Sequence, residues 1–354
     1  MPKKQGRSEL GDACCSHVLI QHAERSKPKK GNQMASRNEK LDLAARAAWM
    51  YYVAGNTQNE IADHLGISRQ MAQRLVAYAR ESGLVKVRVE HPVSTCLELA
   101  AALQQRYGLE QCYVVPSEGA GDSVVDDAGV QQMLAVVGAE VMERYLQQEM
   151  PLVVNVGSGR TLKAVLEAVT EMERPQHRIV SMVGAIAADG SSNRYDVALT
   201  AADKIQARFF LLPAPLVADN AEDMRQWCSH RVYRIVADLA QQADVTFIGV
   251  GTIAPGCPMH VDGFITAEEV AQLQAYGAVG EMIGHAIAGD GRLIASPLEE
   301  RVTSLPLTSP PTRPVIGMAG GARKAEAIRA VLRGGWWSGL ITDEYCARYA
   351  LQDK

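Results

Sequence analysis

From residue 112 to residue 351, short apolar runs alternate with longer segments whose apolar residues recur at helical spacing. Runs such as 152–156 and 245–250 are compact and apolar, as strands of a buried sheet are. Because strands alternate with helices, the sequence predicts a Rossmann-like, parallel α/β domain. The predicted strands are 112–116, 152–156, 179–183, 209–212, 245–250, 315–318 and 340–342, and the predicted helices are 131–148, 161–170, 201–208, 232–243, 266–277, 322–333 and 343–351.

Nearer the N-terminus, residues 57–83 have the pattern of two short helices around a tight turn. Thr57 and Glu60 form a capping box at the start of the first helix. Gly66 ends that helix, and Ser68 caps the second. This arrangement is typical of a helix-turn-helix unit that reads the major groove of DNA.

The second of these helices opens with side chains that can contact DNA. We expect Arg69, Gln70 and Gln73 to read bases, and Arg74 and Lys86 to hold phosphates. The alternative is an ordinary helical hairpin with a solvated polar face. The candidate DNA-binding residues are Thr57, Ser68, Arg69, Gln70, Gln73, Arg74 and Lys86.

The flanking segments complete this unit. Residues 41–53 predict a preceding helix, and the partial alternation of 84–90 predicts a short strand that could form a small wing. Met71, Leu75 and Val76 are the predicted apolar stripe of the second helix. We therefore expect an all-α (winged) helix-turn-helix domain over residues 37–92, followed by an α/β domain over residues 93–354.

Two further segments concern the ends of these domains. Residues 1–36 are predicted to be a disordered extension, either upstream of a natural start at Met34 or a basic arm that touches DNA. Thr95 and Glu98 form a second capping box, which predicts a helix ending at Gly108. That helix would link the two domains and could supply a dimer contact.

Charge is divided unequally along the chain. Residues 1–91 hold 15 Lys and Arg against 9 Asp and Glu, a net charge of +6, whereas residues 92–354 hold 21 against 31, a net charge of −10. A basic N-terminal part and an acidic C-terminal part are typical of a nucleic-acid-binding module joined to a domain that does not bind DNA. The alternative is that the acidic excess serves solubility alone.

Composition excludes several other classes. No run approaches the roughly 20 apolar residues that a membrane-spanning helix needs. The seven cysteines form no C-x-x-C pair, and the eight histidines form no H-E-x-x-H motif. We therefore expect a cytoplasmic protein with reduced thiols, no metal site and no membrane partner.

Three glycine-rich loops follow predicted strands, where open α/β sheets bind ligands. They are 157–161, 249–252, and Gly320 with Gly321 ahead of Arg323 and Lys324. Glycines let the backbone approach an anion, and a helix N-terminus adds its dipole. Each loop alone could be a simple tight turn, but three in one sheet favour a shared anionic ligand.

Nucleotide cofactors fit poorly. Residues 249–254 match G-x-G-x-x-A, but Pro255, Gly256 and Pro258 prevent the helix that a dinucleotide site requires. The G-x-x-x-x-G-K-[ST] motif of many nucleotide-binding proteins is absent from the sequence. We expect no cofactor.

Seven segments together resemble the SorC type of sugar-responsive bacterial transcription regulators, over roughly residue 41 to the C-terminus. The resemblance implies a second domain similar to the sugar-phosphate isomerase fold. It also implies a phosphorylated sugar or polyol effector that changes DNA affinity, and assembly as dimers or tetramers. The segments are IADHLGISRQMAQRLV, VGSGRTL, GSSNRYDV, LLPAPLVAD, IGVGTI, YGAVGEMIGHAIAGDGR and AGGARKAEAIRAVLRGGWWSGLITDE.

The resemblance also implies an effector site. Many members have Asp where this chain has Glu281, a departure that bears on hydroxyl recognition. Glu281 could instead be a helix-start residue, and Lys324 a solvated surface lysine. The implied effector-binding residues are Gly157, Ser158, Gly159, Arg160, Thr161, Gly249, Gly251, Thr252, Glu281 and Lys324.

The leading hypothesis is therefore a regulator that binds double-stranded operator DNA of a carbohydrate or polyol operon and has no catalytic residues. The rival is a sugar-phosphate isomerase with an added DNA module. An isomerase needs a positioned general base. Glu281 or Asp219 could be considered, but the spacing marks neither as a base.

Overall fold

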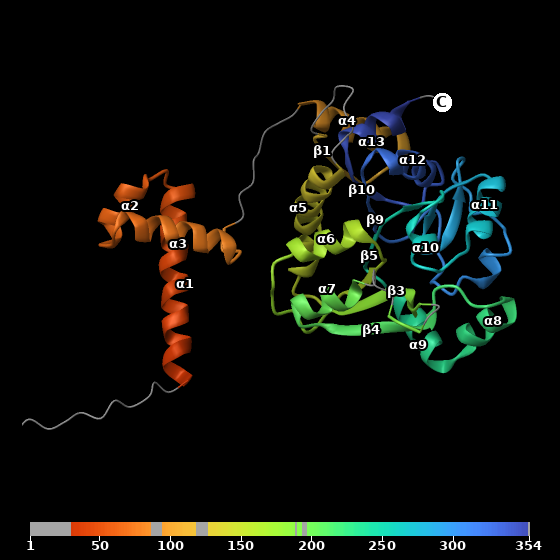
Figure 1. The fold of residues 1–354 in the computed structure, drawn as a ribbon, viewed down its shortest axis with the longest axis horizontal. Helices are drawn as coiled ribbons and strands as arrows, with labels where there is room; N and C mark the ends of the chain where they lie inside the picture. The colour runs from red at the N-terminus through yellow and green to blue at the C-terminus, as the bar shows by residue number, and fades with distance from the viewer. Residues whose placement is uncertain (1–29, 86–93, 118–126, 188–189, 193–196, 353–354) are drawn as a thin grey trace, which may run out of the picture. The chain divides into compact units, whose positions relative to one another are not determined.

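The computed structural model describes residues 30–85, 94–117, 127–187, 190–192 and 197–352. The described residues form two compact units, one on each side of segment 86–93. Both units are drawn in Figure 1.

The N-terminal unit consists of three helices: α1 (Lys30–Tyr52), α2 (Gln58–Leu65) and α3 (Arg69–Glu81). The Thr57 hydroxyl accepts a hydrogen bond from the Glu60 amide, and the Glu60 carboxylate accepts one from the Thr57 amide at 2.7 Å. Gly66 ends α2 at a φ of 64°, a left-handed conformation that glycine adopts without strain. The Ser68 hydroxyl accepts from the Met71 amide at 3.2 Å, so both predicted caps are confirmed.

Small side chains let the three helices approach closely. The prediction of Met71 as part of the buried stripe is wrong, because 41% of this residue is exposed, whereas Leu75 and Val76 are buried as predicted. Alanines at positions 72 and 79 take the inward positions instead. The buried core of the unit is Ala44, Ala47, Ala48, Ile61, Ala62, Ala72, Leu75, Val76 and Ala79.

The ends of the unit differ in part from the prediction. Helix α1 begins at Lys30, so an extension reaching residue 36 is wrong for residues 30–36. No proline lies between Lys30 and Leu41, so the helix can continue through this polar stretch. Residues 1–29 and the predicted wing from Lys86 onward lie outside the described residues.

The C-terminal unit is built on a parallel seven-stranded sheet of order β1-β10-β9-β5-β2-β3-β4. This confirms the predicted parallel α/β architecture, and each predicted strand is present with slightly different ends. The strands are β1 (Gln111–Val115), β2 (Val153–Val156), β3 (Arg178–Ile186), β4 (Arg208–Pro215), β5 (Val245–Ile248), β9 (Val315–Met318) and β10 (Gly339–Asp343).

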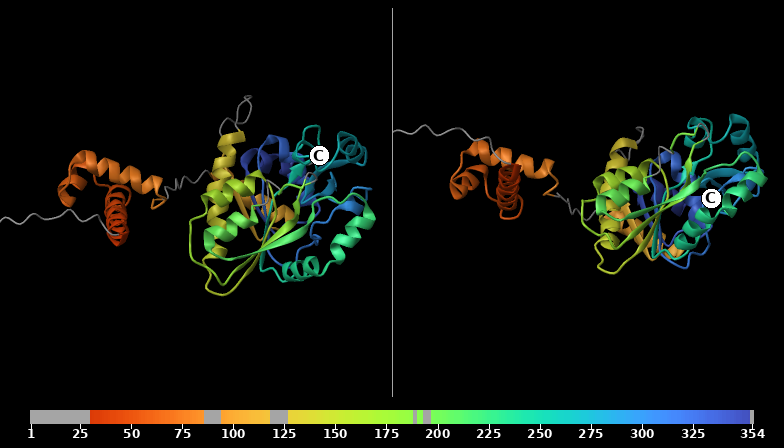
Figure 2. Two further views of the ribbon diagram at one scale, coloured as in Figure 1. Left: turned by 60° about the horizontal axis from the view of Figure 1, so that its bottom comes forward. Right: turned by 90° about the horizontal axis from the view of Figure 1, so that it is seen from below.

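Helices cover both faces of this sheet, as Figures 1 and 2 show. One core packs α5 (Asp127–Leu146), α6 (Arg160–Ala168) and α7 (Ala198–Ile205) against one face. The second core lies on the other face and includes α4 (Ser94–Tyr107) and α9 (Arg231–Ala240). The remaining helices of the unit are α8 (Ala221–Ser229), α10 (Pro258–Val261), α11 (Ala267–Ala275), η1 (Glu299–Arg301), η2 (Ala322–Lys324), α12 (Ala325–Arg333) and α13 (Glu344–Leu351).

A second, antiparallel sheet was not predicted. It consists of β6 (Gly251–Thr252), β7 (Ala278–Met282) and β8 (His285–Ala288).

The capping box predicted for Thr95 is wrong, because α4 begins at Ser94 and Thr95 lies inside its first turn. Helix α4 ends at Tyr107, one residue before the predicted end at Gly108.

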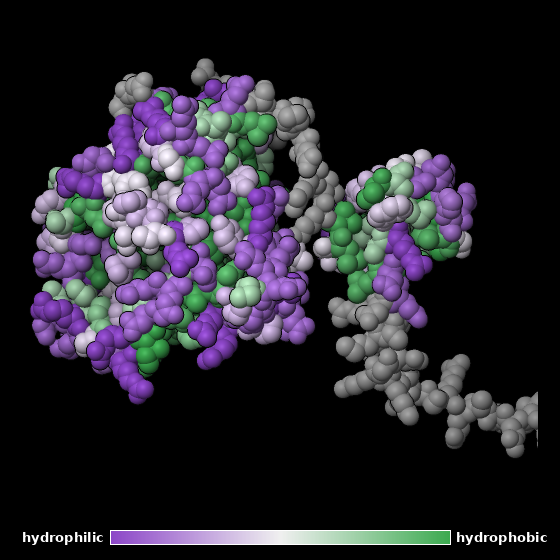
Figure 3. Space-filling model, turned by 180° about the vertical axis from the view of Figure 1, so that it is seen from behind, coloured by the Kyte–Doolittle hydropathy of each residue, from purple (hydrophilic) through white to green (hydrophobic). Residues whose placement is uncertain are grey.

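The surface of the C-terminal unit is mostly polar on the side drawn in Figure 3, where hydrophilic residues are spread among smaller apolar areas. No helix among the described residues combines the length and the hydropathy needed to cross a lipid bilayer.

A fully buried carboxylate joins the C-terminal ends of β9 and β10. Asp343 accepts hydrogen bonds from the Gly321 amide at 2.7 Å, the Cys346 amide at 3.2 Å and the Ser117 hydroxyl at 3.0 Å. Two of these donors are backbone groups that have to be paired when they are buried. Asp343 therefore fixes the Gly320 loop and starts α13 at the same time.

We predict that Asp343→Ala lowers the free energy of unfolding by about 2–4 kcal/mol, because the buried donors lose their acceptor. Urea unfolding followed by circular dichroism measures this. The matched control is Asp290→Ala, since Asp290 is exposed and pairs only with exposed Arg292; it should change stability by less than about 0.5 kcal/mol. Equal losses in the two variants would contradict the role given to Asp343.

Candidate functional site

The sheet order creates one crevice at the carboxyl ends of its strands. From β2, the chain continues to β3 and β4 on one side, whereas β5, β9 and β10 lie on the other side. The order therefore reverses between β2 and β5. Open α/β sheets bind ligands at such a switch point, because the two neighbouring loops leave toward opposite faces.

Two of the predicted glycine loops meet at this point. The 157–161 loop follows β2, and the 249–252 loop follows β5. The Gly157 amide donates to the Phe247 carbonyl at 2.8 Å, which holds the start of the first loop against the end of β5. Gly159 precedes α6 with a φ of 128° and without a side-chain cap, so the first amides of this helix have no capping side chain.

A pocket with a cavity volume of about 100 Å³ opens between these loops and widens toward solvent. Of the ten predicted effector residues, nine line it, and Gly157 is not among the lining residues. The lining residues are Ser158, Gly159, Arg160, Thr161, Leu162, Leu216, Gly249, Val250, Gly251, Thr252, Pro258, Met259, Asp262, Phe264, Glu281, Ile283, Gly284 and Lys324.

The small antiparallel sheet brings Glu281 into this pocket. Glu281 lies opposite Gly251 in the β6–β7 register. A Cβ at position 251 would overlap Oε1 of Glu281, so any other residue there would force the carboxylate to move. Burial raises the pKa of the Glu281 carboxyl, while the hydrogen bond from the Gly284 amide at 2.9 Å and the charge of Lys324 act in the opposite direction.

The β7–β8 turn that carries these groups is strained. Ile283 has a φ of 46° and Gly284 a φ of 94°. The left-handed conformation costs a β-branched residue about 1–2 kcal/mol. The Ile283 side chain is buried and lines the pocket, and its burial offsets a cost of that size.

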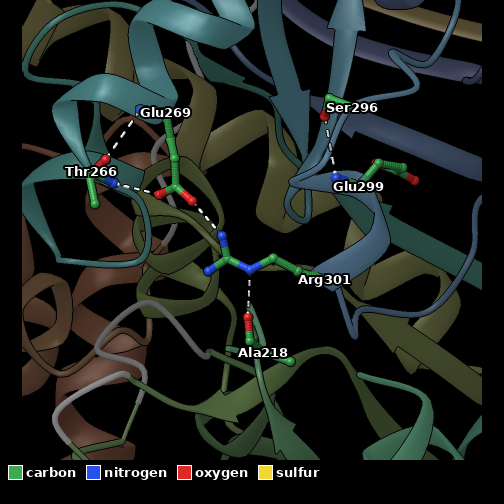
Figure 4. Close-up of polar contacts among 6 residues, drawn as sticks. All are labelled: Ala218, Thr266, Glu269, Ser296, Glu299 and Arg301. Carbon is green, nitrogen blue, oxygen red and sulfur yellow. Dashed lines mark hydrogen bonds and ion pairs between the residues drawn. The ribbon is translucent and has the colours of Figure 1, made fainter. Parts of the chain in front are cut away.

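Arg301 joins the segment after β4 to the start of α11, as Figure 4 shows. Its Nε donates to the Ala218 carbonyl at 2.7 Å, and its Nη1 pairs with the Glu269 carboxylate. Glu269 also accepts from the Thr266 amide at 2.8 Å, in the predicted capping box of α11. Residues shortly before these contacts, Leu216 and Phe264, line the pocket, so the clamp fixes the spacing of the walls.

Two polar atoms of the pocket are buried without a hydrogen-bond partner in the described part of the chain. They are Oγ1 of Thr161 and Oδ2 of Asp262. Thr161 was predicted from its place in the loop, but Asp262 was not. Asp262 follows the one-turn helix α10 in a segment rich in glycine and proline, where no periodic pattern or motif marks it.

The third predicted glycine loop borders an adjoining cavity. Gly320, Gly321 and Arg323 line this second cavity, and Lys324 and Arg160 line both. All three loops therefore surround one region at the carboxyl ends of the strands, and its cationic groups lie between the two cavities.

In the N-terminal unit, the predicted DNA-contacting side chains share the surface of α3. Arg69, Gln70, Gln73 and Arg74 are exposed, whereas the residues that face α1 are small or apolar. The Thr57 hydroxyl already accepts from the Glu60 amide and donates to the Glu60 carboxylate at 2.9 Å. Lys86 lies outside the described residues.

Comparison with known proteins agrees with this two-unit architecture. Residues 91–352 match the family model described as "Putative sugar-binding domain". The chain is 33% identical to the erythritol catabolism regulatory protein EryD of Brucella abortus over 307 residues, which cover 86% of this chain and 95% of that protein. It is 30% identical to the transcriptional regulator LsrR of Escherichia coli K12 over 315 residues, or 88% and 95% of the two chains.

The fold is also that of a solved structure. The full-length sorbitol operon regulator SorC from Klebsiella pneumoniae superposes with a TM-score of 0.63 and 23% identity, over 89% of this chain and all of that one. At this identity the likeness concerns the fold, in which an N-terminal helical region precedes a parallel α/β domain.

We predict a pH-dependent stability difference between the wild type and Glu281→Gln. Because the folded-state pKa of Glu281 is raised, folding favours its protonated form, and this stabilisation is lost as the pH rises from the ordinary pKa of 4.5 through the folded value. As the pH rises through this range, the free energy of unfolding of Glu281→Gln should therefore increase relative to that of the wild type. Urea unfolding from pH 4.5 to 8 measures it, and exposed Glu300→Gln should show no such trend. A flat difference for Glu281→Gln would contradict the assignment.

Proposed function

The chain belongs to the SorC family of sugar-binding transcriptional regulators, and we propose that it binds operator DNA of a polyol or sugar operon under the control of a phosphorylated polyol or sugar. The observation that carries this proposal is the pocket at the β2–β5 switch point, where glycine loops, Arg160 and Lys324 converge. Proteins of this family are transcriptional regulators rather than enzymes, as EryD and LsrR are.

The anionic part of the effector would lie at the N-terminus of α6. A phosphate there would receive hydrogen bonds from loop amides and the Ser158 hydroxyl, and would lie at the positive end of the helix dipole. The unpartnered Thr161 hydroxyl supplies another donor. Arg160 and Lys324 add the charge that a phosphate needs when it leaves water.

The DNA-binding residues would be those of the helix-turn-helix. Arg69, Gln70 and Gln73 would contact base edges, and Arg74 and Lys86 would contact phosphates. The Ser68 hydroxyl accepts one backbone hydrogen bond, and it would donate its proton in a hydrogen bond to a DNA phosphate. Thr57 would support binding mainly as the cap of α2, since its hydroxyl is engaged twice.

Control would follow from assembly. A dimer or tetramer places two helix-turn-helix units on successive half-sites of a DNA duplex. An effector that binds one arrangement of the subunits better than another would change DNA affinity by that difference in free energy. Such a regulator would work in the cytoplasm, on double-stranded operator DNA.

The first experiment is fluorescence anisotropy on DNA from upstream of the protein's own operon, at fixed salt. EryD is named for erythritol catabolism, so erythritol 4-phosphate is the first effector to test, and sorbitol 6-phosphate and inorganic phosphate follow. A shift in DNA affinity with one polyol phosphate but not with inorganic phosphate is the expected result. Turnover of aldose and ketose phosphates without specific DNA binding would instead support the isomerase alternative.

We predict that Gln70→Ala weakens binding to the operator about 10-fold and relaxes the base preference at one position, because a bidentate base contact is lost. Arg74→Ala should weaken operator and unrelated DNA by similar factors and reduce the dependence of binding on salt, because a phosphate contact is lost. Anisotropy titrations on single-base operator variants separate the two roles. Equal losses at every base position for Gln70→Ala would refute its reading role.

We predict that Arg160→Met and Lys324→Met each weaken binding of the effective polyol phosphate about 10- to 100-fold, because each removes a charged hydrogen bond. Calorimetric titration of the full chain measures this. Lys163→Met is the matched control, since Lys163 is exposed on the same helix as Arg160 but does not line the pocket. A loss in the control equal to that of Arg160→Met would show a general charge effect instead.

A further inference from the structure

The pocket has a second polar region, formed by carboxylates. Glu281 projects from β7, and Asp262 follows α10, so the two acids come from different elements of the unit. An ionised carboxylate accepts hydrogen bonds and donates none. Both side chains can therefore accept hydrogen bonds from hydroxyl groups, and each repels a phosphate while it is ionised.

Nothing among the described residues satisfies the Asp262 carboxylate where it is buried. Its Oδ2 atom is shielded from solvent and has no hydrogen-bond partner there. Buried polar atoms in native proteins are nearly always paired, with protein groups, water or a ligand. Glu281 differs, because its Oε2 already accepts from the Gly284 amide at 2.9 Å. Asp262 is thus the acid with more unused acceptor capacity.

The Asp262 side chain has no evident role in holding the fold together. The backbone of Asp262 ends α10, with its amide donating to the Pro258 carbonyl at 2.9 Å, and that bond does not involve the side chain. The pocket beside it also contains Met259 and Phe264, apolar surfaces against which the carbon chain of a sugar can pack.

From these observations we propose that Asp262 is a specificity-determining residue that accepts hydrogen bonds from the hydroxyl groups of the effector. The inference rests on the proposed function and deepens it by naming the residue that recognises the hydroxyl groups of the effector, whose phosphate would lie at the α6 loop and whose hydroxyls would lie at Asp262 and Glu281. The ligand is held in one direction, because the acids repel the end that Arg160 and Lys324 attract.

The test compares two ligands with the same carbon chain. Erythritol 4-phosphate carries hydroxyls that n-butyl phosphate lacks, so their affinity ratio isolates hydroxyl recognition. Calorimetric titrations would use the full-length wild type, Asp262→Asn and Asp262→Ala, with inorganic phosphate as a third ligand. Asp238→Asn, an exposed acid on α9, is the control. Circular dichroism would check that each variant is folded.

We expect the wild type to prefer erythritol 4-phosphate, and Asp262→Ala to reduce that preference about 10- to 100-fold, the loss expected for a hydrogen bond to a charged group. Asp262→Asn should lose less than Asp262→Ala, since its amide oxygen still accepts. Affinity for n-butyl phosphate and inorganic phosphate should not fall in either variant, since neither ligand has a hydroxyl-bearing chain and the loss of the Asp262 charge removes a repulsion.

Three outcomes would overturn the inference, and they differ in what else they affect. If folded Asp262→Ala keeps the wild-type ratio, the role of Asp262 is refuted while the proposed phosphorylated effector stands. If the wild type binds erythritol 4-phosphate and n-butyl phosphate equally, hydroxyl recognition by this pocket is refuted for a four-carbon polyol. If it binds no phosphate compound at all, the proposed function fails, and this inference fails with it.

Discussion

The effector-site geometry depends on one topological constraint, the reversal of strand order between β2 and β5. From β2 to β3 to β4, and from β5 to β9 to β10, the chain moves along the sheet in one sense on each side. Between β2 and β5 the chain leaves in opposite directions, and a crevice remains that side chains of the sheet cannot fill. The hydrogen bond from the Gly157 amide to the Phe247 carbonyl fixes its floor, and the Arg301 clamp fixes the distance between its outer walls.

The crevice combines opposite charges in a small space. Arg160 and Lys324 are balanced by Asp262 and Glu281, so the pocket holds as many cationic as anionic side chains. A site of this kind does not bind simple anions as strongly as a purely cationic one would. It suits a ligand that is itself divided into an anionic and a hydroxyl-bearing end, and the orientation of the ligand then follows from electrostatics as much as from shape.

Much of this could be predicted from the sequence, where the physical cause is local. The caps at Thr57, Ser68 and Thr266 depend on residues three positions apart, and the strands follow from continuous apolar runs. Local patterns gave wrong predictions where tertiary contacts determine the structure. Thr95 lies inside a helix that starts one residue earlier. Met71 faces outward because alanines fill the interface between the helices of the N-terminal unit. Helix α8 was not predicted, although Met224, Trp227 and Cys228 recur at helical spacing, and none of its residues is fully buried. Asp262 is part of the pocket only through the fold of a loop, which no spacing reveals.

The close approach of position 251 to Glu281 constrains how such a protein could change its specificity. A methyl group at 251 overlaps Oε1 of Glu281 as it stands, so Gly251→Ala requires the carboxylate to move. Glu281→Asp removes one methylene from that side chain, so less of it stands in the way. The effects of the two substitutions on stability are therefore coupled, and Gly251→Ala should cost less once position 281 holds the shorter acid.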